Sequence, residues 1–150
     1  MFGVPDTKAT GETTEAVVLA EFVKAGFPVL VPWGDNRRYD LVVEVSGSFL
    51  RVQCKTATPC GWRGDRACIR FMARSRELDG RAYSRSRPYR DQADLFAAYA
   101  PTTGQVYVLP VAEVPESDVW LRLTPAKNNQ QLKIRLAEDH TLAAWAARQS

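Results

Sequence analysis

Four polar residues in the first half of this 150-residue chain have side chains suited to metal-dependent hydrolysis. They are Glu15, Asp40, Gln53 and Lys55. Carboxylate and amide oxygens, with a backbone carbonyl such as that of Cys54, are ligands that Mg²⁺ prefers. An amine beside them can orient or deprotonate an attacking water and stabilise the charge that builds up in the transition state. These residue types indicate hydrolysis at a phosphorus centre, if the fold brings them together.

Glu15 lies on the first expected helix, which should run from residue 11 to residue 25 and end at Gly26, a good C-terminal cap residue. On a helical wheel Glu15 falls in the middle of an apolar stripe, with Thr14 on the opposite side. The stripe consists of Val18, Leu19, Phe22 and Val23. A carboxylate facing the core is unfavourable unless a cation or hydrogen bonds meet it. A structural salt bridge to an arginine and a functional role are therefore both open.

The other three residues lie on two expected strands, 39–45 and 49–55, joined by a turn at 46–48 into an antiparallel hairpin. Asp is uncommon in strands, so Asp40 at the start of the first strand suggests a specific role. On the second strand, alternation separates two sets of side chains onto opposite faces. Leu50, Val52 and Cys54 form one set, and Arg51, Gln53 and Lys55 form the other.

The remaining segments are expected to complete one domain, 1–150, without repeats or linkers. The arginine-rich segment that follows residue 71 is expected to be mostly loop. The other expected strands are 28–32, 67–71, 94–100, 106–110, 119–123 and 132–136, with a polar turn at 125–131 and a terminal helix at 138–148.

The order of these residues resembles the PD-(D/E)XK nuclease superfamily. The resemblance is carried by Gly11 with Glu15, by Tyr39-Asp40 and by Gln53-Cys54-Lys55. Gln53 departs from the superfamily pattern, because a neutral amide replaces an acid and removes one charge from the metal site. The homing endonucleases of cyanobacterial group I introns and their bacterial relatives are similar in having glutamine there. Further matches to that subgroup lie at 11–15, 32–36, 39–40, 52–57, 94–99, 104–110, 121–123 and 128–130.

The resemblance implies a restriction-endonuclease-like α/β core, in which an N-terminal helix packs on a mixed β-sheet with a central β-hairpin. It also implies Mg²⁺-dependent, site-specific cleavage of double-stranded DNA, with Mn²⁺ able to substitute, by a homo-oligomer (dimer or tetramer). Glu15 and Asp40 would be the metal-side carboxylates, assisted by the Gln53 amide oxygen and the Cys54 carbonyl, and Lys55 would act on the water. A Holliday-junction resolvase and a catalytically inactive DNA-binding module of the same fold are the alternatives.

Positive charge is concentrated in one stretch of the chain. The net charge is only +3, but nine arginines and three acids between residues 63 and 90 give that stretch +6 and leave the rest at −3. Guanidinium groups pair well with phosphates, and Trp62, Tyr83 and Tyr89 lie among them. A solvated loop with internally paired arginines, or an RNA-binding segment, would give the same pattern. The candidate DNA-binding residues are Arg37, Arg38, Arg63, Arg66, Arg70, Arg74, Arg76, Arg81, Arg85, Arg87 and Arg90.

Composition argues against several other classes. The chain is 45% hydrophobic with three cysteines, unlike disordered chains and disulfide scaffolds. No membrane-length apolar run or secretory signal is evident, so we expect no membrane partner and a cytoplasmic bacterial or phage-encoded protein. A single histidine, His140, disfavours zinc hydrolases and HNH-type nucleases. The spacing of Cys54, Cys60 and Cys68 likewise disfavours a zinc site.

Overall fold

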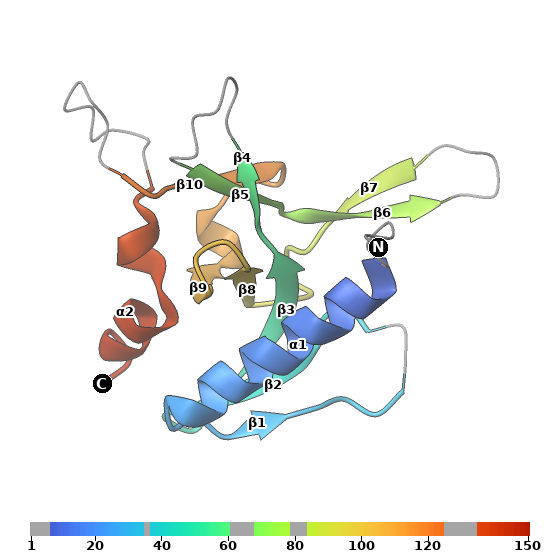
Figure 1. Ribbon diagram of the computed structural model, residues 1–150. Coiled ribbons are helices and arrows are strands. Elements are labelled where there is room, and N and C mark those ends of the chain that lie inside the picture. The colour runs from blue at the N-terminus through green and yellow to red at the C-terminus, as the bar shows by residue number, and fades with distance from the viewer. Residues whose placement is uncertain (1–6, 35–36, 61–67, 79–83, 125–134) are drawn as a thin grey trace.

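The computed structural model describes residues 7–34, 37–60, 68–78, 84–124 and 135–150. Helix α1 (Thr7–Lys24) packs on a five-stranded sheet in the order β1-β2-β3-β8-β9 (Figure 1). Its strands are β1 (Val29–Leu30), β2 (Leu41–Val45), β3 (Ser48–Thr56), β8 (Leu95–Ala100) and β9 (Gln105–Pro110). All neighbours are antiparallel except β3 and β8, which are parallel. The predicted helix on a mixed sheet is therefore confirmed.

Two smaller sheets accompany the main one. The first has the order β10-β5-β4, and the second pairs β6 with β7. Their strands are β4 (Thr58–Cys60), β5 (Cys68–Met72), β6 (Arg74–Leu78), β7 (Ser84–Pro88) and β10 (Asp118–Arg122). We call the antiparallel pair β6 and β7 the arm, and Figure 1 shows it projecting from the body beyond the N-terminal end of α1. The expectation that the arginine-rich segment is mostly loop is wrong, because backbone pairing needs no apolar alternation. Strand β4 was not predicted.

The two faces of the main sheet carry two separate cores. On one face, Val18 and Phe22 of α1 pack with the alternating side chains of β2 and β3 and with Trp145. Trp145 lies on α2 (Leu142–Ala147), with its ring 5.7 Å from that of Phe22. The other face packs Phe96 of β8 against Phe71 of β5 and the rest of the small sheet. The polar residues of β3 therefore emerge beside the second core and on the face opposite α1.

Helix α1 differs from its prediction in two respects. It begins at Thr7 rather than residue 11, and its buried residues are Thr14, Val18 and Phe22, while Val23 is 54% exposed. The helical wheel misplaced Thr14 because it counted threonine as polar. Glu15 consequently lies beside the buried stripe rather than in its middle. The C-terminal cap is confirmed: Gly26 has φ 93°, and the N–H of Phe27 donates to the carbonyl of Phe22.

Several other predicted elements are confirmed with small shifts. Strands β2 and β3 form the expected hairpin, with Ser46 (φ 50°) and Gly47 (φ 84°) in its turn. The predicted strands 28–32, 67–71, 94–100, 106–110 and 119–123 correspond to β1, β5, β8, β9 and β10. Most of the expected strand 132–136 and all of the turn 125–131 lie outside the described residues, although Leu136 forms an isolated parallel bridge with Arg122.

The terminal helix is interrupted. It consists of η3 (Ala137–His140), a 3-10 turn, followed by α2, because Thr141 between them is extended and its hydroxyl accepts a hydrogen bond from the N–H of Ala144. A second 3-10 turn, η2 (Val111–Glu113), follows β9. Within the described part of the chain, no helix is long and apolar enough to cross a membrane.

Candidate active site

Asp40 lies where β2 and β3 part. The pairing of the two strands ends at Leu41 opposite Val52, whereas β3 continues to Thr56. The N–H of Asp40 donates to the carbonyl of Val52 at 2.8 Å, and its Oδ2 accepts from the N–H of Cys54 at 2.9 Å. The Asp40 side chain thus satisfies the next backbone donor of β3, and this contact fixes its position.

Glu15 meets Asp40 from α1. The hydroxyls of buried Thr14 and of Thr56 share a hydrogen bond of 2.7 Å, which joins α1 to the end of β3. The adjacent Glu15 carboxyl lies close enough to the Asp40 carboxyl for each group to influence the pKa of the other. Burial, followed by the nearby Asp40 charge, raises the pKa of Glu15. Burial also raises the pKa of Asp40, although the Cys54 N–H and the Lys55 charge oppose this shift.

Gln53, Cys54 and Lys55 supply the remaining groups. Gln53 Nε2 donates to the Cys54 carbonyl at 3.3 Å, so the candidate amide and carbonyl lie side by side. Lys55 Nζ donates to the hydroxyl of Tyr89 at 3.2 Å. Burial lowers the pKa of Lys55 to about 8, against the opposing effect of Asp40 and with a further lowering by Arg38. An amine with this pKa can exchange a proton near neutral pH.

These donors fit a hard divalent cation. All are oxygens: two carboxylates, one amide and one backbone carbonyl. Burial raises the pKa of both Glu15 and Asp40, and a bound cation would favour the charged form of each carboxyl. Among the described residues no three His, Cys, Asp or Glu side chains gather into a metal-binding group, so the two carboxylates would need the Gln53 amide and the Cys54 carbonyl beside them.

Comparisons with known proteins identify a family and a similar fold. A model of the PD-(D/E)XK endonuclease family matches residues 5–143. The chain belongs to this family. The solved structure of a bacterial homing endonuclease, I-Ssp6803I, is similar in fold, with a TM-score of 0.71 at 24% sequence identity. The match covers 96% of this chain and 93% of that one.

A curated relative is Protein 5.3 of Escherichia phage T7. It is 45% identical over 49 residues, which are 33% of this chain. The match spans 42% of the phage protein, less than half of its length.

In this PD-(D/E)XK endonuclease the candidate DNA-binding arginines have different surroundings. Arg70 forms an ion pair with Asp118 at 3.1 Å, and Arg90 pairs with Glu116 at 3.5 Å. Arg38 is half-buried and bonded to protein groups, whereas Arg37 and Arg74 are exposed. In the backbone register of the arm, Arg76 lies opposite Ser86, Arg85 opposite Glu77 and Arg87 opposite Ser75. Arg63, Arg66 and Arg81 lie outside the described residues, as do Trp62 and Tyr83.

Two groups of residues around the site were not assigned there from sequence. Tyr89 was grouped with the nucleic-acid segment but is buried and contacts Lys55. Thr14 and Thr56 join the helix to the strand, and the spacing of Thr14 four residues before Val18 was the signal for its burial. For Tyr89 the sequence offers no comparable signal.

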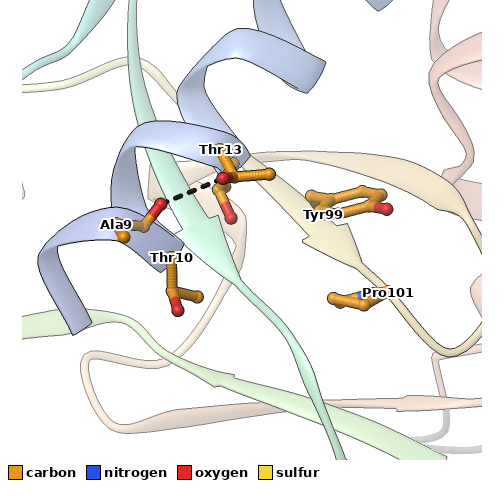
Figure 2. A pocket seen from close by; sticks show the side chains of 6 residues that line it. Ala9, Thr10, Thr13, Tyr99 and Pro101 are labelled. Atoms are coloured by element: carbon orange, nitrogen blue, oxygen red, sulfur yellow. Dashed lines mark hydrogen bonds between the residues drawn. The ribbon is translucent and has the colours of Figure 1, made fainter. Parts of the chain in front are cut away.

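A hollow near the site has different chemistry. About 250 Å³ in volume, it lies between the N-terminal half of α1 and the end of β8. Figure 2 shows Tyr99 and Pro101 on one side and helix residues on the other, with Thr13 Oγ1 donating to the Ala9 carbonyl at 3.0 Å. Thr10 and Thr14 complete the lining, which includes no carboxylate from the part of the chain that the structure describes. The Glu15–Asp40 pair is therefore the better candidate active site.

Proposed function

We propose that this chain is a Mg²⁺-dependent, site-specific endonuclease of the homing type that hydrolyses double-stranded DNA. The observation that carries the proposal is the proximity of the Glu15 and Asp40 carboxyls where the pairing of β2 with β3 ends, with Gln53 and Lys55 following on β3. The family match and the similarity in fold to a homing endonuclease support it.

The proposed mechanism assigns each group a separate task. Asp40, Glu15, the amide oxygen of Gln53 and the carbonyl of Cys54 would hold Mg²⁺, with Mn²⁺ as a substitute. The bound ion would lower the pKa of a water and stabilise negative charge on the phosphate. Lys55, whose pKa burial lowers to about 8, would orient or deprotonate that water and stabilise the transition state.

DNA would be held mainly through its phosphates. The arm carries Arg74, Arg76, Arg85 and Arg87 on a two-stranded ribbon that extends from the body (Figure 1). Arginine forks pair with phosphate oxygens or with guanine edges in the major groove. Arg37 lies three residues before Asp40 and would contact DNA near the cleaved bond. Assembly into a dimer or tetramer would supply one active site for each strand.

The direct test is incubation of the full chain with a randomised duplex-DNA library and Mg²⁺. The comparison includes Asp40→Ala, an EDTA sample, and the matched control Asp139→Ala, which removes an exposed acid from η3. Discrete Mg²⁺-dependent ends from the wild type and Asp139→Ala, absent for Asp40→Ala, are the expected result. A branched-junction substrate cleaved in preference to linear duplex would instead identify a Holliday-junction resolvase.

Gln53 favours a second candidate, an inactive DNA-binding module, because a neutral amide contributes less charge to a cation than a carboxylate. Tight duplex binding that persists in EDTA, without any cleavage, would support that function. Gln53→Glu would then be the informative variant, since restoring the charge should restore cleavage if the site is otherwise intact.

A further inference from the structure

Tyr89 contacts two cationic side chains beside the site. Its side chain is buried, and its ring packs edge-on against Phe96 with 5.6 Å between ring centroids. Arg38 Cζ lies 4.0 Å from the Tyr89 ring centroid, and Lys55 Nζ lies 4.6 Å from it. The Lys55 ammonium also donates to the Tyr89 hydroxyl. A cation–π attraction and a hydrogen bond, both with Tyr89, therefore fix the position of the Lys55 ammonium.

Arg38 holds this ring in turn and connects it to the arm. Its guanidinium donates to the side chain of Gln92, to the hydroxyl of Ser75 and to the carbonyl of Pro88. These acceptors lie on the turn after the arm, on β6 and at the end of β7. One side chain, two residues before Asp40, thus joins the start of the catalytic hairpin to the base of the arm.

The Arg38 guanidinium donates its hydrogen bonds to protein acceptors from three segments. This arrangement is better suited to a structural role than to binding a phosphate. Lysine carries its charge on a flexible four-carbon chain, so a productive position must be imposed from outside. A displacement of about 1 Å at a reacting group reduces rates by as much as a hundredfold. We infer that Tyr89 is a positioning residue for Lys55 and that Arg38 fixes Tyr89. The inference rests on the proposed nuclease function, which gives Lys55 its task.

The first test replaces Tyr89 by phenylalanine, which keeps the ring and removes the hydroxyl. Single-turnover cleavage of saturating duplex DNA should slow about tenfold, the loss expected for one hydrogen bond, while the Kd for DNA stays unchanged. The matched control is Tyr107→Phe, which removes another buried hydroxyl, bonded to Thr103 at 3.0 Å, on β9. It should cleave at the wild-type rate. Wild-type cleavage by Tyr89→Phe, or a slower rate shared equally by Tyr107→Phe, would overturn the inference.

A second measurement does not depend on cleavage. Acetic anhydride labels accessible amines, and mass spectrometry of peptides gives the labelling rate of each lysine. Lys55 should be labelled several-fold faster in Tyr89→Phe and in Arg38→Lys, which keeps the nearby positive charge but loses the guanidinium fork, whereas exposed Lys24 should react equally in all three proteins. Equal Lys55 labelling would contradict the inference. Faster labelling in a chain that never cleaves DNA would contradict the proposed function alone.

Discussion

Around Asp40, partly buried polar groups are held in place by backbone and side-chain hydrogen bonds. Along the arm, by contrast, the arginines lie on a ribbon that projects from the body. In the first region each contact constrains position, and removal of one partner leaves a half-buried donor or acceptor unpaired. In the second, charges act through long-range attraction that salt screens. We therefore expect site variants to change reaction rate and arm variants to change DNA affinity.

The largest expected effect is that of Lys55→Ala. Loss of a group that acts on the attacking water should slow single-turnover cleavage about 10²–10⁴-fold, with the Kd for duplex DNA within about twofold of wild type. Lys24→Ala, an exposed lysine on α1, is the control. Hydrolysis at the wild-type rate would refute the role proposed for Lys55.

The arm should show the opposite behaviour. The double variant Arg76→Ala/Arg87→Ala should weaken DNA binding and lower the slope of log affinity against log salt by about 2, because two phosphate contacts are lost. The cleavage rate at saturating DNA should stay the same. Fluorescence anisotropy across a salt series measures the slope.

Arg70→Ala is the comparison within this set, since Arg70 already pairs with Asp118. Arg70→Ala should change the slope of log affinity against log salt by less than half of the change seen for the double variant. An Arg70 effect as large as that of the double variant would show that the ion pair opens to bind DNA.

A smaller effect is expected where α1 meets β3. Thr14→Val keeps the shape of the side chain but removes its hydrogen bond to Thr56, and should lower stability by about 1 kcal/mol. Because Glu15 is the next residue, Thr14→Val should slow cleavage more than the matched change Thr13→Val, which removes a hydroxyl bonded to the local Ala9 carbonyl. Urea unfolding and single-turnover kinetics measure both quantities. Equal cleavage rates for the two variants would show that the hydrogen bond between Thr14 and Thr56 does not position Glu15.

The smallest expected effect concerns Asp94, which lies outside both regions. Its hydrogen bonds with Arg51 lower the pKa of Asp94 below its usual value. The charged form therefore stabilises the fold at pH values above about 4, and this contribution is lost as pH falls through the lowered pKa. Urea midpoints should show Asp94→Asn less stable than wild type at pH 7, with the difference shrinking at pH 3. A difference that grows in acid would contradict this assignment.

The sequence was most informative where a local pattern reports a local contact. Alternation and the Ser46-Gly47 turn predicted the hairpin, and this hairpin brings Asp40 next to Cys54. The contacts of Tyr89 with Lys55 and of Arg38 with Pro88 join residues 34 and 50 positions apart, and no periodicity marks them. The arm was missed because the alternation of its serines and arginines carries no apolar signal.

The parallel pairing of β3 with β8 has a consequence for how such a protein changes over evolutionary time. Val52 lies opposite Leu95, so β4, β5 and the arm all occupy one connection between two adjacent strands. Loop-closure entropy rises only slowly with loop length. Insertions and deletions near the tip of the arm would therefore leave the pairing register of β3 and β8 intact. For the nuclease function proposed above, DNA target preference would diversify through changes in the length of that connection while the candidate active-site residues remain in place.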